Sequence, residues 1–153
     1  MKYKRLGEVP LPRLAKGSDR IEPGIVDLVR GLRAIGLTTT ESCPGHVCEC
    51  NGDHEVNHIP YVMVRFNNEE ELKRLDSVLK LFNERNDIDW AITSNTKHLK
   101  WVRGKAAASV LPISEVLKEP DSRRLTRMQE NSKALARFMF EVARGLDGAH
   151  GRG

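Results

Sequence analysis

All three cysteines of this 153-residue chain, and three of its five histidines, lie in one segment, residues 43–58. Thiolate and imidazole are strong ligands for zinc and related metals, and they are also the most useful nucleophile and base near neutral pH. Any chemistry that this protein performs is therefore expected in this segment. The clustering alone leaves open whether that chemistry is metal binding, thiol reactivity or the binding of a small ligand.

The segment begins with a predicted turn, Cys43-Pro44-Gly45-His46. Proline presets the backbone of the second residue of a turn, and glycine supplies the positive φ that a type II turn requires at the third. The first and fourth residues then approach to less than about 7 Å between their Cα atoms. The turn is thus expected to bring the Cys43 thiol and the His46 imidazole together.

A hairpin is predicted next, because Asn51-Gly52 is the strongest two-residue hairpin signal. In it His46, Cys48 and Cys50 share one face, and His54 lies on the other. Alternate residues of a regular strand are about 6.6 Å apart, whereas zinc needs ligand atoms within about 2.0–2.3 Å. A shared metal site therefore requires a bulge or a looped path after His46. The predicted cross-strand pairs are Val47 with Val56, Cys48 with Glu55, Glu49 with His54, and Cys50 with Asp53.

The first hypothesis for this segment is a metal- or ligand-binding site with zinc as the expected ion. Zinc is favoured because the candidate ligands are thiolates and imidazoles. The expected ligands are Cys43, His46, Cys48 and Cys50, and an irregular loop would recruit His54 or His58 instead.

The second hypothesis is a thiol site, in which Cys43 is catalytic and His46 lowers its pKa and takes its proton. Backbone N–H groups of the turn would hold an anion, and Thr40, Ser42 and Gly45 would contact the ligand. Thr38 and Glu41 could supply further polar contacts from the strand. The third hypothesis assigns no site, because cysteine is often a small buried hydrophobic residue. The sequence leaves open whether the protein is an enzyme.

The spacing of apolar residues predicts the elements that must position this segment. Helical spacing is found over 25–35, 68–85 and 122–146, and strands are expected at 37–42 and 61–66. Asn68 with Glu71 resembles a helix start. A hairpin is predicted from 88–92 and 99–101 around a polar turn at 94–97, and 106–113 is expected to continue in the sheet. This order predicts an α+β fold, with a small, mostly antiparallel sheet covered by helices and a long C-terminal helix.

The length fits a single domain over residues 1–153. Its parts are expected to be a basic extended arm at 1–20, an α+β core at 21–118, the C-terminal helix at 121–147 and a frayed tail at 148–153. The apolar side of the long helix is expected to pack on the core or on a second copy in a homodimer. Lys133, Arg137 and Arg144 lie on the opposite side, which is either simply solvated or binds nucleic acid.

The net charge of +4 and the pI of about 9.1 are compatible with an anionic partner. The basic arm could hold RNA or another anionic ligand. No apolar run approaches the roughly 18–20 residues of a membrane span, and the first residues lack an apolar signal segment. We therefore expect a cytoplasmic protein, in which clustered cysteines favour metal binding or reactivity over disulfides.

Residues 16–46 resemble the N-terminal part of the wybutosine-synthesis tRNA methyltransferase family. In that family a helix is followed by a threonine- and serine-rich strand that ends in Ser-Cys-Ser-Gly-Arg, and Pro44 and His46 depart from this motif. The resemblance implies S-adenosylmethionine as cofactor and a modified guanosine in tRNA as substrate, with Ser42, Cys43 and His46 in the pocket. The Ser-Cys-x-Gly-His string also resembles small phage and bacterial domains. The matching residues are Thr39, Thr40, Ser42, Cys43 and Gly45.

Overall fold

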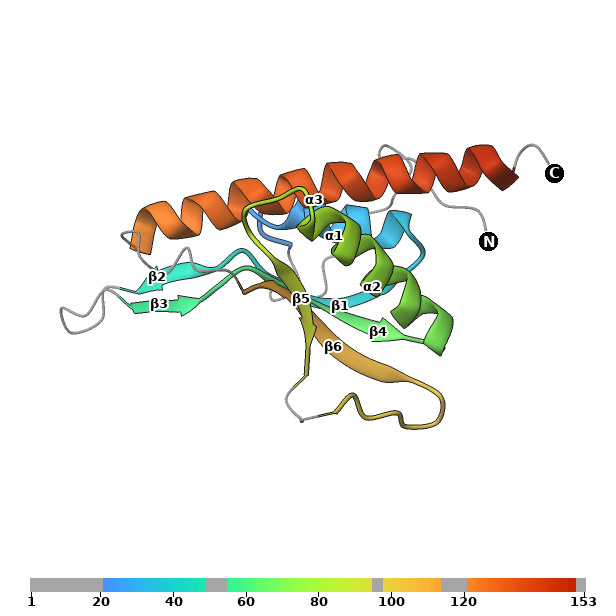
Figure 1. Ribbon diagram of the computed structural model, residues 1–153. Coiled ribbons are helices and arrows are strands. Elements are labelled where there is room, and N and C mark those ends of the chain that lie inside the picture. Colours follow the sequence, from blue (N-terminus) through green and yellow to red (C-terminus); the bar gives the residue numbers. More distant parts are fainter. Residues whose placement is uncertain (1–20, 49–54, 95–97, 114–120, 151–153) are drawn as a thin grey trace.

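The structure is a computed structural model that describes residues 21–48, 55–94, 98–113 and 121–150. It confirms an α+β fold with an antiparallel sheet and a long C-terminal helix (Figure 1). The helices are α1 (Val26–Ala34), α2 (Glu69–Asn83) and α3 (Asp121–His150). The strands are β1 (Thr38–Cys43), β2 (His46–Cys48), β3 (Glu55–His58), β4 (Tyr61–Phe66), β5 (Trp90–Thr93) and β6 (Ala106–Pro112). The predicted arm at 1–20 lies outside the described residues.

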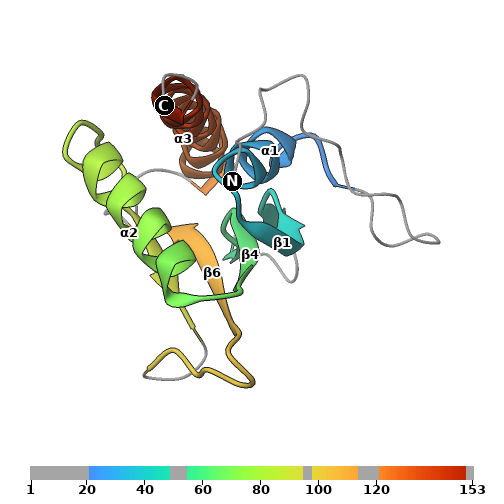
Figure 2. The same cartoon turned by 90° about the vertical axis from the view of Figure 1, so that its right-hand side faces the viewer.

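Four strands form the main sheet in the order β1-β4-β6-β5, and every neighbouring pair is antiparallel. Strands β2 and β3 form a separate two-stranded sheet that projects from it (Figure 1). The helices lie on one side of the main sheet, as the view turned by 90° also shows (Figure 2). This arrangement places the Cys/His segment at one end of the molecule, where β1 leaves the sheet.

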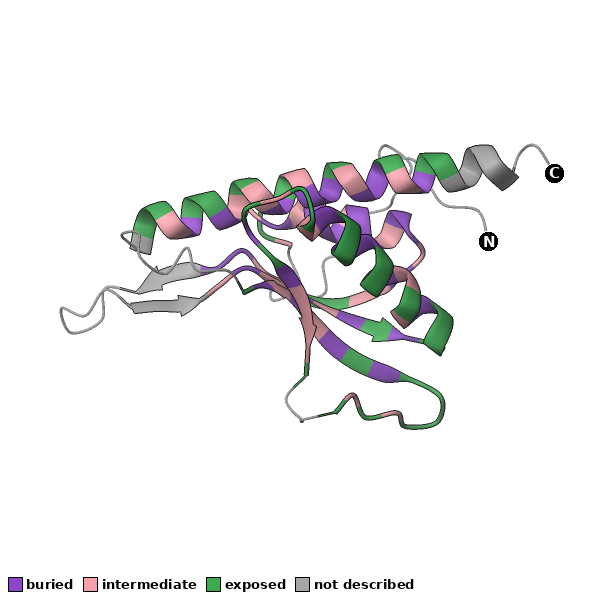
Figure 3. Cartoon of the chain, in the orientation of Figure 1, coloured by how far each residue is buried: buried purple, intermediate pink, exposed green. Residues whose placement is uncertain are grey.

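The hydrophobic core lies between the main sheet and the helices. Residues of β4 and β6 alternate between buried and more exposed positions (Figure 3), so one face of the sheet packs on the helices. The opposite face, with Met63, Arg65, Ala107 and Ser109, is half-buried or exposed. The buried sheet residues include Val62, Val64, Phe66, Trp90, Ala108 and Val110.

Helices α1 and α3 cross at very close range. A Cβ added to Gly31 would lie 3.0 Å from the Cα and 3.3 Å from the carbonyl oxygen of Ala136. Leu32, Leu135 and Met139 are fully buried beside this crossing. The apolar side of α3 therefore packs on the core, as predicted, while Lys133, Arg137 and Arg144 are exposed. A homodimer through this helix stays a prediction.

The first turn of α2 begins as its sequence predicts. The Asn68 side chain accepts a hydrogen bond from the Glu71 backbone N–H at 2.9 Å, and Glu71 in turn accepts the Asn67 N–H at 3.0 Å. These bonds satisfy donors that a helix start leaves unpaired. They also explain why Glu71 can be only 4% exposed.

A polar network joins the end of α2, strand β5 and helix α3. Asn86 and Asn131 exchange two amide hydrogen bonds of 2.8 and 2.9 Å, and the indole N–H of Trp90 donates to Asn131 at 2.8 Å. The Asn83 side chain accepts the Trp90 backbone N–H and donates to its carbonyl, both at 2.9 Å. The network fixes the indole of Trp90, which is 1% exposed, in the core.

The predicted hairpin between 88–92 and 99–101 is wrong. Strand β5 pairs with β6, from Trp90 opposite Pro112 to Thr93 opposite Ser109. Residues 98–101 alternate in exposure but form no strand, and Leu99 and Trp101 pack against the core instead. The tight turn lies later, at 102–105, where Arg103 and Gly104 both have positive φ. The longer β6 supplies a full ladder, which two alternating residues cannot match.

Helix α3 continues to His150, so residues 148–150, which were expected in the tail, are helical. Among the described residues, no helix combines the length and the apolar character that crossing a bilayer requires.

Candidate functional site

The tight turn predicted at residues 43–46 is wrong. Cys43 ends β1 opposite Tyr61, and His46 begins β2 opposite His58, so β2 continues in the direction of β1 along the same returning chain. Pro44 and Gly45 are buried between the two strands but form no turn. The backbone therefore carries His46 along the ribbon away from Cys43 and does not bring the two residues together. Gly45 does have the predicted positive φ, 86°. A side chain would be strained at this φ, so glycine is required here although no turn forms.

The start of α1 and the middle of α3 hold the connection between β1 and β2, residues 44–45, in place. The Gln129 side chain donates a hydrogen bond of 2.9 Å to the Pro44 carbonyl. A Cβ added to Gly24 would lie 2.8 Å from the Cβ of Pro44, so the chain before α1 also packs directly on the proline ring. Two segments far apart in the sequence thus fix the point from which the Cys/His hairpin projects.

Replacing Gly24 with alanine is expected to displace the connection at residues 44–45. The new Cβ would meet the Pro44 ring at 2.8 Å and Gln129 Nε2 at 3.4 Å, and a rigid ring cannot yield as a flexible side chain does. We expect a loss of about 1–2 kcal/mol in unfolding free energy and a clear shift of the Gly45 amide resonance. Gln129→Ala removes the hydrogen bond without the clash and should shift that resonance less. An unmoved Gly45 resonance in Gly24→Ala would contradict the packing.

Cys43 lies on the uncovered face of the sheet beside Tyr61 and Glu41. The register places Cys43 opposite Tyr61, and alternation along β1 puts Glu41 on the same face. The Tyr61 hydroxyl donates to the Glu41 carboxylate at 3.4 Å. The Cys43 Sγ accepts the backbone N–H of Gly45 at 3.4 Å. The half-buried thiol therefore has the Gly45 N–H as a donor, and a carboxylate and a phenol as neighbours.

The pKa of Tyr61 is raised above its ordinary value of 10.0. Burial disfavours the phenolate, and the negative charges of Glu41 and of the Cys43 thiolate, with the hydrogen bond to Glu41, favour the neutral phenol. Above pH 10 the unfolded chain releases this proton before the folded chain does. The stability that Tyr61 contributes is therefore complete below pH 10 and is lost as the pH rises through the folded-state pKa.

Glu41→Gln is expected to lower the pKa of Tyr61 but to leave it above 10.0, because burial remains. Ultraviolet absorption of the phenolate measures this titration, and Tyr3→Phe removes the signal of the second tyrosine. Glu69→Gln, at an exposed position of α2, is the matched control. An unchanged Tyr61 titration in Glu41→Gln would show that the carboxylate does not act on the phenol.

The β2–β3 ladder confirms two predicted pairs and adds an irregularity. Val47 lies opposite Val56 and Cys48 opposite Glu55, as predicted. A regular ladder would then set His46 opposite Asn57, but the register shifts between His46 and Val47 and pairs His46 with His58. The extra residue of this bulge is in β3, so the described part of β2, residues 46–48, stays regular and lacks the bulge after His46 that the predicted ligand set requires.

The structure separates some of the residues that were predicted to act together. Ser42 lies opposite Val62 of the core face, whereas Cys43 lies on the other face of β1. Thr40 falls at the register shift of β1 and is exposed. The predictions on Cys50 and His54 lie outside the described residues, and so does the direction of the His46 side chain. A common pocket of Thr40, Ser42 and Cys43 therefore gains no support from the strand geometry.

Among the described residues, no group of three or more His, Cys, Asp and Glu side chains is placed to hold a metal ion. Of the four predicted ligands, Cys43 is the one whose side chain belongs to that described set. The sequence predicts Glu41 among the polar contacts of this site, and the structure places it on the same face of β1 as Cys43. Tyr61 was missed, because its place beside Cys43 depends on the pairing of β1 with β4.

Comparison of the chain with protein-family models, curated proteins and solved structures finds no significant match. The resemblance to the tRNA methyltransferases, and the S-adenosylmethionine and tRNA that it implies, therefore stay predictions. The fold and the geometry of the Cys/His segment are what support a functional proposal.

Proposed function

We propose that this chain binds a transition-metal ion, with zinc as the expected ion, on the β2–β3 ladder that continues from Cys43. The observation that carries the proposal is the shifted register, which pairs His46 with His58 and Cys48 with Glu55. All four residue types are zinc ligands. Without the shift, the partner of His46 would be an asparagine, which is not a usual zinc ligand.

The register gathers the backbone positions of these four residues into a small area of the hairpin. Cross-strand partners are about 4.5–5.5 Å apart between Cα atoms, and residues two apart on a strand are roughly 6.6 Å apart. His46 and Cys48 are two apart on β2, whereas Glu55 and His58 are three apart on β3, with the extra residue of the bulge between them. Two neighbouring cross-strand pairs occupy a shorter stretch of the hairpin than three alternate residues of a single strand, which supports a shared ion.

The proposal keeps His46 and Cys48 of the predicted ligand set and adds Glu55 and His58. Cys43 and Cys50 stay predicted ligands of an alternative Cys₃His set. Four protein ligands make a closed site, which is typical of structural rather than catalytic zinc. Binding would close the hairpin and add stability, about 4 kcal/mol when free zinc is a thousandfold above its Kd.

Titration with cobalt(II) and then zinc tests the proposal, since thiolate-bound cobalt absorbs in the near ultraviolet. We expect one ion per chain with a thiolate signal. His58→Ala should weaken zinc binding by more than the roughly 10–100-fold that loss of an outer hydrogen-bond partner costs. His98→Ala, an exposed position outside the hairpin, is the matched control.

Cys43→Ser separates the two ligand sets. If it abolishes binding while His58→Ala does not, the Cys₃His set is correct and the hairpin-face set is wrong. Protein purified without chelator that contains less than one ion per chain, with all thiols free to react, would overturn both.

A further inference from the structure

The main sheet has one uncovered face. The helices lie on its other side (Figure 2), and the residues of β4, β5 and β6 alternate between the two faces. Small or apolar side chains make up most of the uncovered face, among them Met63, Ala91, Ala107, Ser109 and Leu111. These residues are half-buried or exposed, so the face is accessible to a partner.

Two charged side chains of opposite sign lie on this face, Glu41 on β1 and Arg65 on β4. Glu41 is opposite Met63, so Arg65 is its diagonal neighbour at about 7–8 Å. In the described part of the chain, the exposed Arg65 side chain forms neither an ion pair nor a hydrogen bond. Glu41 accepts a long hydrogen bond of 3.4 Å from Tyr61. Both charges are therefore accessible to an opposite charge from another molecule.

We propose that a second copy of this chain covers the uncovered face, so that two sheets pack face to face about a two-fold axis. In a two-fold interface, residue i of one copy contacts residue j of the other, and j contacts i. An axis that passes between Glu41 and Arg65 therefore creates two identical ion pairs, each between an arginine of one copy and a glutamate of the other. The charges of this face are thus complementary to those of the same face in a second copy.

The remaining residues of the face are compatible with this packing. Packed sheets lie about 10 Å apart, and their side chains interdigitate. The short side chains of Ala91, Ala107 and Ser109 leave space for the longer Met63 and Leu111 of the other copy. The centre of an interface is usually poor in charge. Within the four strands this face is neutral overall, although the chain carries a net charge of +4, so a polyanion such as a nucleic acid is a poorer match.

The size of the face predicts a weak dimer. Strands β1 and β4 have six residues each, so four strands cover roughly 20 by 20 Å, or about 400 Å² per copy. A standard interface buries about 800 Å² per partner. We therefore expect a reversible dimer with a Kd in the micromolar range. This dimer does not depend on the proposed metal site.

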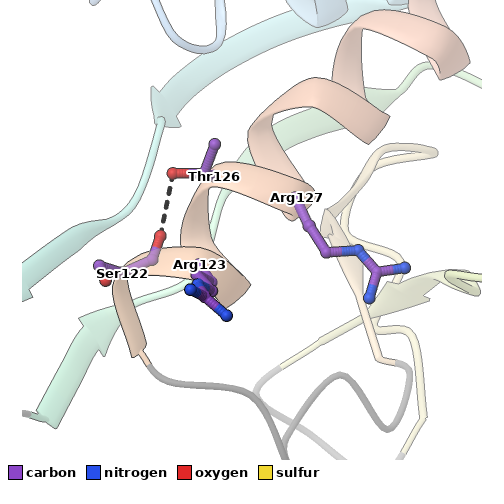
Figure 4. Close-up of a pocket in the computed structure, with 4 residues that line it drawn as sticks. All are labelled: Ser122, Arg123, Thr126 and Arg127. Carbon is purple, nitrogen blue, oxygen red and sulfur yellow. Dashed lines mark hydrogen bonds between the residues drawn. The ribbon is translucent and has the colours of Figure 1, made fainter.

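Sedimentation velocity of the full chain, from low micromolar to near-millimolar concentration, tests the proposal. EDTA and a reductant exclude association through a metal ion or a disulfide. Arg65→Glu sets two carboxylates against each other across the axis and should weaken the dimer at least about tenfold. The control Arg123→Glu makes the same change at an exposed position in the recess at the start of α3 (Figure 4) and should leave the Kd unchanged.

The charge-reversed double variant Glu41→Arg/Arg65→Glu is the sharper test. It restores opposite charges across the axis, so its Kd should return to within about threefold of the original value. If circular dichroism shows that Arg65→Glu is unfolded, Glu41→Arg alone sets two arginines against each other and replaces it. A chain that stays monomeric at near-millimolar concentration would overturn the proposal. A dimer that Arg65→Glu leaves intact, or that Arg123→Glu weakens equally, would also overturn it, because the contact would then lie on another surface.

Discussion

Replacing Asn131 with alanine is expected to lower the free energy of unfolding by about 2–4 kcal/mol. The substitution leaves the Trp90 indole N–H, in a residue that is 1% exposed, without its acceptor. It also removes both bonds of the amide exchange with Asn86. A buried donor left unsatisfied costs about 1–3 kcal/mol, and the lost side chain adds a gap between α2, β5 and α3.

Urea unfolding measures this loss of stability. A surface variant and a double variant serve as controls. Glu130→Ala, an exposed neighbour on the same helix, should change stability by less than about 0.5 kcal/mol. Asn86→Ala combined with Asn131→Ala should cost less than the sum of the single losses, by about 0.5–3 kcal/mol, since both belong to one network. Additive losses would mean that the two amides act independently.

Gly31→Ala is expected to lower the free energy of unfolding by about 1–3 kcal/mol, although alanine is the better helix former. The added Cβ would lie 3.0 Å from the Ala136 Cα and 3.3 Å from both the Ala136 carbonyl oxygen and the Met139 Cβ. Two of these three atoms belong to backbone, so relief requires α1 and α3 to move apart. That movement opens gaps between the fully buried residues beside the crossing.

Gly145→Ala is the matched control for Gly31→Ala. A Cβ at Gly145 meets nothing within 4 Å, so the substitution should raise stability by about 0.5–1 kcal/mol through helix propensity alone. Thermal or urea unfolding of the two variants should therefore shift in opposite directions. A stability gain in Gly31→Ala would show that the helices accommodate the methyl group.

Local signals predicted most of the elements. The apolar spacing of α1, α2 and α3, the Asn68 cap and the strand 61–66 depend on residues close together in the chain, and all appear in the structure. The pairing of strands that are far apart in the sequence could not be predicted in this way. The alternation of Leu99 and Trp101 was real, but their side chains pack on the edge of the core while β6 takes the place beside β5.

In the candidate site, too, local signals were only partly right. The positive φ of Gly45 and the Val47–Val56 pair agree with the sequence, but the predicted turn at 43–46 does not form, because β2 and β1 pair with the same returning chain. The shift that sets His46 opposite His58 depends on one extra residue in β3, and no local propensity determines where such a residue is placed. The bond from Gln129 to Pro44 joins residues 85 positions apart and has no sequence signature.

The two edge strands of the main sheet affect how readily this protein would aggregate at high concentration. Strand β5 has four residues, and β1 is interrupted at Thr40, where the ladder with β4 shifts. Short or bulged edge strands pair poorly with a strand of another chain. This is one way in which natural proteins avoid amyloid-like aggregation. The irregularity in β1 thus protects a sheet that would otherwise offer a long, regular border to other chains.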